Sequence, residues 1–244
     1  MIAEPVIEVR GLTVGFGANR VLDGVDLAVA RGESLVVIGG SGAGKSVLLR
    51  SILGLERIDA GEIRLDGRPA TPAVRADFLR GFGMLFQAAA LFDSMPVWKN
   101  VAFRLLQTMP RAEARARALD RLARVGLDSA VADRMPAELS GGMRKRVGLA
   151  RAVAANPRVI FFDEPTTGLD PQRAAAINDL IRGIVTETGA TAVTITHDMH
   201  SVRTIADRVA MLANGRLRWQ GTVAELDSAD DPVLRDFVDG RPLV

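Results

Sequence analysis

The segment GGSGAGKS, residues 39–46, constrains the fold more than any other part of this 244-residue chain. It matches the pattern G-x-x-x-x-G-K-[ST], with the apolar run SLVVI before it and VLLRSIL after it. That order predicts a strand, a glycine-rich turn and a helix whose buried face carries Leu48, Leu49 and Ile52. A glycine-rich turn without function explains the segment less well, because both flanking elements are in place.

Several groups of such a turn can bind the phosphates of a nucleotide. Its backbone N–H groups and the helix start face phosphate oxygens, Lys45 adds a positive charge, and Ser46 can ligate magnesium. Val47 stands where many such loops have a second hydroxyl residue, so one side-chain contact is lost while the backbone N–H remains. The expected nucleotide contacts are Gly39, Gly40, Ser41, Gly42, Ala43, Gly44, Lys45, Ser46 and Val47.

Short β-branched or aromatic runs alternate with helical patterns along the chain. The predicted strands are Val6–Val9, Ser34–Ile38, Arg158–Phe162 and Ala190–Thr196. This alternation predicts an α/β fold with a sheet that is largely parallel in its core. A helix is expected from Pro171, with Gly189 as its stop and a repeated apolar face at Ile177, Leu180, Ile181 and Ile184.

Residues 89–156 differ, because they are helical in composition and contain no convincing strand. We predict one domain over 1–244, in which 89–156 form a helical subdomain inserted into a nucleotide-binding core of 1–88 and 157–220. Residues 221–244 are expected to form a short helical tail. The arginines from Arg111 to Arg124 are interpreted as a solvated helix face rather than a membrane or nucleic-acid surface.

The composition excludes several classes of protein. There is no cysteine, which excludes disulfides, thiolate metal sites and a cysteine nucleophile and favours a cytoplasmic location. The formal net charge is only +2, so we expect no nucleic-acid partner. The start MIAEPVIEVRGL shows no export signal, and the apolar runs are far shorter than the roughly 20 residues that cross a bilayer. A role at a membrane would need a partner.

The apolar run VIFFDE ends in two carboxylates, Asp163 and Glu164. At the carboxyl edge of a sheet, beside the phosphate loop, Asp163 can hold magnesium through water and Glu164 can activate the attacking water as general base. His197 ends another apolar strand and can bond a γ-phosphate or hold the water in line. Gln87 could reach magnesium or the water, whereas His200 is interpreted as structural. Each residue alone is commonly structural, and the phosphate loop gives the set its weight.

The motif LSGGM, Leu139–Met143, adds a second anion-binding helix start. Ser140 is a good N-cap, and Gly141 and Gly142 permit close approach of the backbone to an anion. The γ-phosphate of a nucleotide on the same chain already has its expected partners, Lys45, Ser46, Gln87 and His197. A two-fold dimer resolves this, with each Ser140 and Gly142 closing over the nucleotide of the other chain.

With these motifs in order, the chain resembles the ATPase subunit of an ATP-binding-cassette (ABC) transporter over nearly its whole length. The resemblance implies a P-loop NTPase (RecA-like) core with a parallel sheet, an antiparallel β part near the N-terminus and an inserted α-helical signature subdomain. It implies hydrolysis of ATP with Mg²⁺ coupled to transport. It also implies that Phe16 stacks on adenine, although a core phenylalanine is an alternative, and that Asp170 of the Gly168–Asp170 turn contacts the nucleotide.

Three further features resemble the ATPases of lipid transporters that work with MCE-domain proteins, the Mla phospholipid system above all. They are Met143, where most family members have Gln, the stretch Met84–Phe103, and the tail Asp231–Gly240. This resemblance implies a homodimer of ATPase subunits under a permease at the inner membrane, an MCE-domain protein and a STAS-domain protein. Leu91, Phe92 and Met95 would receive a cytoplasmic helix of the permease, or would simply pack the helical subdomain.

Three alternatives remain at this stage. A transporter of another cargo, such as an amino acid or a metal chelate, shares all the ATPase motifs. A soluble ABC protein acting on ribosomes or DNA usually has two cassettes or a long coiled-coil insertion, and neither is seen here. A simple phosphotransferase leaves LSGGM unexplained.

Overall fold

The computed structural model describes residues 5–241 and divides into two compact units, Met1–Arg80 with Thr191–Val244, and Gly81–Ala190. Both contain strands whose residues are almost all buried, because continuous apolar runs such as SLVVI in β3 (Ser34–Ile38) and VIFFD in β7 (Val159–Asp163) can be covered on both faces.

The first unit contributes four strands, β3 among them, to one sheet. The strand order is β10 (Arg216–Thr222), β9 (Arg208–Ala213), β3 and β8 (Thr191–Ile195). β3 runs parallel to β8 and β9, with Val36 opposite Thr194 and Val209, and β10 is antiparallel to β9. The parallel core strand predicted at Ser34–Ile38 is therefore confirmed with its bounds.

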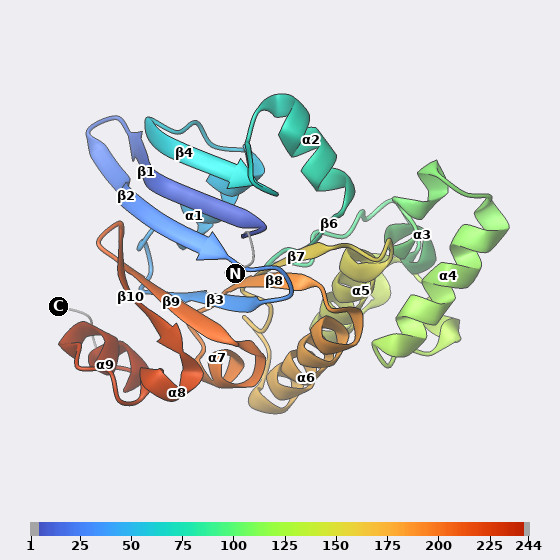
Figure 1. The fold of residues 1–244 in the computed structure, drawn as a ribbon. Helices are drawn as coiled ribbons and strands as arrows, with labels where there is room; N and C mark the ends of the chain where they lie inside the picture. The colour runs from blue at the N-terminus through green and yellow to red at the C-terminus, as the bar shows by residue number, and fades with distance from the viewer. Residues whose placement is uncertain (1–4, 242–244) are drawn as a thin grey trace. The chain divides into compact units, whose positions relative to one another are not determined.

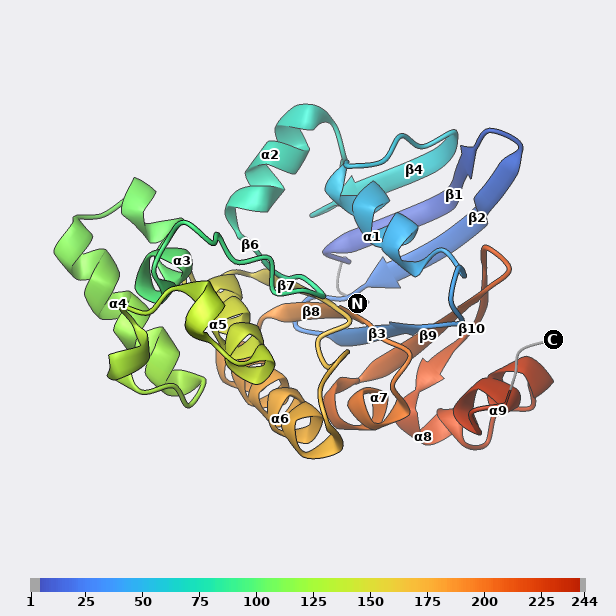
Figure 2. The same ribbon diagram turned by 180° about the vertical axis from the view of Figure 1, so that it is seen from behind.

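An antiparallel sheet forms the N-terminal part of the same unit, as expected. Its order is β2 (Asn19–Val29), β1 (Ile7–Phe16), β4 (Ala60–Leu65) and β5 (Arg68–Pro69), and Figure 1 shows β1 between β2 and β4. The helices of this unit are α1 (Lys45–Leu53), α2 (Pro72–Arg80), α7 (Met199–Ile205), α8 (Val223–Leu226) and α9 (Pro232–Val238). Seen from behind in Figure 2, α1 lies next to β2 and buries Leu48, Leu49 and Ile52.

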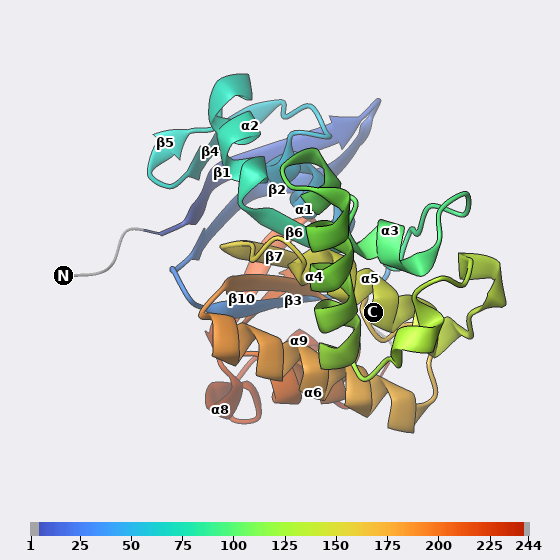
Figure 3. The ribbon, with the colours of Figure 1, turned by 90° about the vertical axis from the view of Figure 1, so that its right-hand side faces the viewer.

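The second unit pairs β6 (Phe82–Leu85) in parallel with β7, with Met84 opposite Phe161. Between them the chain is helical: α3 (Val97–Val101), α4 (Arg111–Arg124) and α5 (Gly141–Val153), with the 3₁₀ turns Leu105–Gln107, Ser129–Val131 and Pro136–Glu138. Helices α3, α4 and α5 pack against one another (Figure 3). The strand-free character predicted for residues 89–156 is confirmed.

Helix α6 (Pro171–Thr188) follows β7 and has both of its predicted ends. The Asp170 side chain accepts a hydrogen bond from the backbone N–H of Arg173 at 2.9 Å, and Gly189 ends the helix in the left-handed conformation. The arginine-rich helix α4 is a solvated face, as interpreted from sequence, since Arg115, Arg117 and Arg124 form exposed ion pairs with neighbouring carboxylates.

Candidate nucleotide and signature sites

The structure places the predicted site residues in two groups, one in each unit. The phosphate loop, Phe16 and His197 lie in the first unit, and Gln87, Ser140–Gly142, Asp163, Glu164 and Asp170 lie in the second. The predicted proximity of Asp163 to the phosphate loop stays a prediction. Each group has its own geometry, which local sequence explains.

The phosphate loop joins β3 to α1. Gly44 occupies the N-cap of α1 with φ of 99°, and as a glycine it provides no side-chain cap to the helix. The Lys45 ammonium donates to the carbonyl oxygens of Gly39 at 2.7 Å and Gly40 at 2.9 Å, which folds it back over the loop. The result is a concave, positively charged backbone turn, the arrangement that binds phosphate.

Two glycines of this loop are required by the fold itself. A Cβ at Gly39 would lie 2.3 Å from the carbonyl oxygen of Leu212, and one at Gly44 would lie 2.6 Å from the Leu22 side chain and 3.0 Å from the Val21 carbonyl oxygen. Both residues also have positive φ, which other residues adopt only with strain.

His197 follows β8 and is exposed at the start of a capped helix. The next residue, Asp198, caps α7 by accepting hydrogen bonds from the backbone N–H groups of His200 at 3.0 Å and Ser201 at 3.2 Å. Partial burial disfavours the Asp198 carboxylate, but these bonds and one from the Ser201 hydroxyl outweigh it and hold the pKa of Asp198 below its usual value. The cap fixes the backbone on which His197 is presented. His200 is a surface residue of α7, in keeping with a structural role.

Phe16 ends β1 and is 51% exposed. The alternative that it is a core phenylalanine is therefore wrong for the described residues. An exposed ring at a strand end is available for stacking, and the adenine contact remains a prediction.

Glu164 sits in an unusual backbone conformation just beyond β7. Its φ is 47°, in the left-handed region that non-glycine residues enter at a cost and that clusters at functional sites. The hydroxyl of Thr167 donates to Glu164 Oε2 at 3.0 Å, which orients the carboxylate. Sequence reasoning found Glu164 but not Thr167, whose place in the TTGLD run three residues further on was the available signal.

The structure brings Gln87 and Glu164 to one side chain, Lys145. The Lys145 ammonium donates to the backbone carbonyls of both residues. This lysine was not among the predicted site residues, although it lies two positions beyond the LSGGM motif.

The signature motif begins α5 with a side-chain cap. Ser140 Oγ accepts from the backbone N–H of Met143 at 3.3 Å, which confirms the predicted N-cap. A Cβ on Gly141 would meet nothing within 4 Å, and one on Gly142 would meet only the Arg173 side chain at 3.5 Å. Neither glycine is therefore required by the packing of its own chain.

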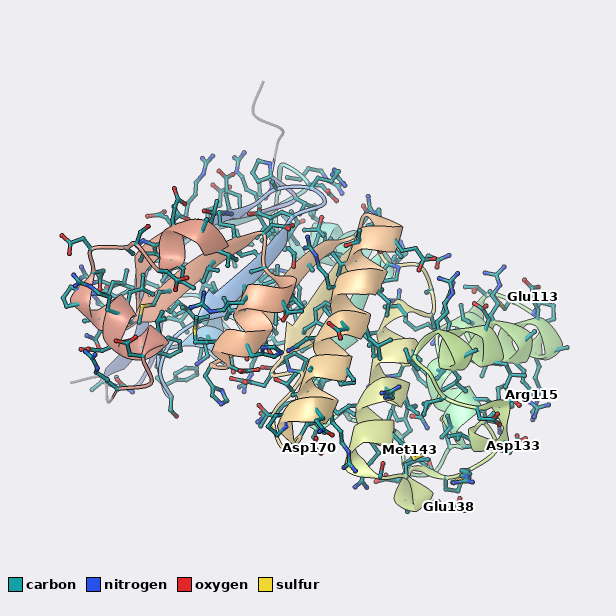
Figure 4. The ribbon with its side chains drawn as sticks, turned by 90° about the horizontal axis from the view of Figure 1, so that it is seen from below. Glu113, Arg115, Asp133, Glu138, Met143 and Asp170 are labelled. Carbon is teal, nitrogen blue, oxygen red and sulfur yellow. The ribbon has the colours of Figure 1, made fainter. Side chains whose placement is uncertain are left out.

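The N-terminal ends of α5 and α6 lie next to each other. Figure 4 shows this with Met143 and Asp170 labelled. A pocket of about 160 Å³ lies at this end, lined by Ser140, Gly142, Met143, Arg146, Arg173 and Ile177. Its two arginines and the α5 N-terminus make this surface suited to an anion.

The residues predicted to hold magnesium supply only oxygen ligands. The Ser46 hydroxyl forms no hydrogen bond within residues 5–241, so it is available as a ligand, and the Asp163 carboxylate ends β7. No group of three or more His, Cys, Asp or Glu in the described part of the chain could hold a metal ion by itself. This fits Mg²⁺ bound to a nucleotide, which uses one or two protein oxygens and completes its shell with phosphates and water.

Fold and site together define a P-loop nucleotide-binding protein with an additional capped, glycine-rich helix start. The family model described as "ABC transporter" matches residues 22–167, more than half of the chain. The chain belongs to the ABC transporter family and is an ATP-binding cassette, the ATPase that uses MgATP to drive transport.

Relatives extend the similarity to nearly the full chain. The probable ribonucleotide transport ATP-binding protein mkl of Mycobacterium tuberculosis is 41% identical over 96% of this chain and 67% of its own length. The methionine import ATP-binding protein MetN of Caulobacter vibrioides is 47% identical over 91% of this chain and 69% of its own. The cassette MJ0796, solved as a dimer with ADP and phosphate, aligns with a TM-score of 0.80 and 30% identity over 89% of this chain and 98% of that one.

Within residues 5–241, no helix is both long enough and apolar enough to span a membrane.

Proposed function

We propose that two copies of this chain bind two MgATP molecules and power a membrane permease. The proposal of a dimer rests on the glycine pair of the signature motif. Each of these glycines has room for a Cβ within its own chain, which leaves space for the nucleotide of a second copy. Ser140 caps α5 with its oxygen, so its hydroxyl hydrogen can still be donated to a phosphate of the other copy. The dimeric form of the related cassette MJ0796 supports this arrangement.

Each residue has a role that follows from its chemistry. Backbone N–H groups of residues 39–47 and the Lys45 ammonium bind the β- and γ-phosphates. Ser46, Gln87 and Asp163 hold the Mg²⁺, which when bound neutralises charge that develops on the transferred phosphoryl group. Asp170 and Phe16 are assigned to further nucleotide contacts.

Glu164 takes a proton from the attacking water. Its backbone is fixed in a left-handed conformation and its carboxylate by Thr167, so the base is oriented before substrate arrives. His197, presented ahead of the Asp198 cap, donates to the γ-phosphate or holds the water in line. ATP binding closes the pair, and hydrolysis reopens it.

Glu164→Gln tests the assigned base. The amide cannot accept the proton, so we expect the hydrolysis rate to fall on the order of 10²- to 10⁴-fold while ATP binding is retained and ATP-dependent dimers accumulate. Glu187→Gln is the matched control, because that carboxylate is exposed on α6 and, among residues 5–241, pairs only with Arg124. A Glu164→Gln protein that hydrolyses ATP at the normal rate contradicts the assignment.

An apolar groove in the second unit is proposed to receive the permease. It has a volume of about 440 Å³, and Phe86 and Phe92 on its wall are 41% and 40% exposed. Leu91 and Met95, the other residues predicted at this surface, are half-buried nearby in the chain. Such a groove fits the apolar face of a helix. Phe92→Arg should abolish co-purification with the permease while ATP binding by the isolated chain is retained.

The proposed cargo is lipid, with an MCE-domain protein and a STAS-domain protein as further partners and the cassette peripheral on the cytoplasmic side of the inner membrane. Met143, the stretch Met84–Phe103 and the tail Asp231–Gly240 support this. The names of the relatives favour a second candidate, a ribonucleotide or methionine. Affinity purification from solubilised membranes decides: an MCE-domain protein and phospholipid support lipid, whereas a solute-binding protein overturns it.

A further inference from the structure

Lysine is rare in this chain, and one of its lysines is buried. Only Lys45, Lys99 and Lys145 are lysines among 31 basic residues. Lys45 belongs to the phosphate loop, and Lys99 on α3 is half-buried with Nζ 5.9 Å from the centre of the Trp98 ring. Lys145 on α5 is 6% exposed. A compact ammonium fits a small buried site better than a guanidinium does, so the residue type at 145 matches its surroundings.

The Lys145 ammonium binds two backbone carbonyls rather than a carboxylate. It donates to Gln87 O and, at 3.1 Å, to Glu164 O, and it forms no ion pair within residues 5–241. Burial lowers the pKa of Lys145, while the charges of Glu164 and Asp163 oppose that effect. A buried ammonium is costly unless it is hydrogen-bonded, so these two carbonyls are what keep it in place.

Both carbonyls belong to residues with proposed roles in hydrolysis. Glu164 is the proposed base, and its carbonyl also accepts from the backbone N–H of Thr167 at 3.3 Å, so the strained peptide is held from two sides. Gln87 follows β6 and is exposed, and its backbone carbonyl accepts from the buried Lys145 ammonium. The donor comes from α5, the helix that begins at the signature motif.

We propose that Lys145 is a positioning residue for ATP hydrolysis, which ties α5 to the backbone of Gln87 and Glu164 and fixes both for the reaction. It acts through those residues and does not contact the nucleotide. The proposal rests on the roles proposed above for Gln87 and Glu164. The proposal predicts that the single Lys145 ammonium holds α5, Gln87 and Glu164 in fixed positions relative to one another.

Lys145→Met tests this, because it keeps the length of the side chain and removes the donors. We expect kcat to fall on the order of 10²-fold, the effect of a misplacement of about 1 Å, while KM for ATP stays within about twofold. Lys99→Met is the matched control, with the same substitution in the same unit and parental kcat expected. A merely structural role would lower the melting temperature without separating kcat from KM.

A second variant keeps the test decisive if Lys145→Met does not fold by circular dichroism. Lys145→Gln retains one donor group and should show an intermediate kcat at unchanged KM. Parental kcat in the folded variants, or a raised KM at unchanged kcat, overturns the proposal.

A double-mutant cycle with Gln87→Ala separates this inference from the proposed function. If Lys145 acts through Gln87, the double variant should lose less than the product of the two single losses. Fully multiplicative losses overturn the coupling. If instead Glu164→Gln keeps the normal rate, the assigned base fails, and that result is independent of the Lys145 data.

Discussion

The two glycine-rich helix starts of this molecule are built differently. Helix α1 has Gly44 as its N-cap, which is left-handed and provides no side-chain cap, and Gly39 and Gly44 of its loop are enforced by neighbouring atoms of the same chain. Helix α5 starts at Ser140, which caps it, and its glycines have open space around them. The first start is shaped by its own fold, and the second leaves room for a partner.

This contrast separates two reasons for glycine that look the same in sequence. At Gly44 the reason is backbone conformation and packing, so a change should damage the cassette itself. At Gly142 the proposed reason lies outside the chain, so a change should spare the fold and affect only the assembled state. Stability and assembly can be measured separately, which makes the contrast testable.

The largest effect is expected for Gly44→Ala. Its Cβ would crowd Leu22 and the Val21 carbonyl at positive φ, a strain of about 1–3 kcal/mol, and the turn that binds phosphate would be displaced. We expect a lower free energy of unfolding in urea and loss of fluorescent ATP-analogue binding.

Gly183→Ala is the control for that change. Gly183 lies inside α6, and a Cβ there meets nothing within 4 Å, so alanine should stabilise the protein by roughly 0.5–1 kcal/mol. Normal nucleotide binding by Gly44→Ala would contradict the claim that the glycine at the start of α1 is required by backbone conformation and packing.

The parts of the fold that sequence predicted best are the strands buried on both faces. β3, β7 and β8 are rich in β-branched or aromatic residues and almost fully buried, and they lie where expected to within a residue at each end. β10 could not be found this way, because RLRWQGT has no buried residue, and β6 is only four residues long with a glycine. β1 extends well beyond the predicted Val6–Val9. The prediction stopped short because shifts in the pairing of β1 with β2 interrupt the apolar alternation after Val9.

An effect of intermediate size, on ATP hydrolysis, is expected for Gly142→Ala. The chain has room for the methyl group and the backbone is helical, so the free energy of unfolding should be unchanged or slightly higher. A single protomer should still bind ATP, whereas hydrolysis should fall tenfold or more because the methyl group blocks close approach of the other copy's phosphate.

Light scattering in the Glu164→Gln background measures the assembled state directly. ATP should convert that protein to dimers, and adding Gly142→Ala should prevent it. Dimers formed equally well in both proteins would show that the open glycine pair of α5 does not face a partner.

Among the site residues, motif spacing predicted those that bear the chemistry, and packing alone revealed those that hold them. Ser140 and Asp170 were predictable as caps because the cap is a local hydrogen bond. Lys145 was not, because a lysine in the run RKR is typical of a solvated face. Its partners, 58 and 19 residues away, become neighbours only when α5 packs in the folded unit.

A modest effect on stability is expected for Ser140→Ala, and this change separates the two functions assigned to the Ser140 hydroxyl. Losing the bond from Met143 N–H should lower the free energy of unfolding by about 1 kcal/mol. Ser140→Asp retains the cap but adds a negative charge where a phosphate should approach, so it should keep stability and abolish ATP-dependent dimers. If Ser140→Asp dimerises normally with ATP, the α5 start is a capped helix end and not an anion site.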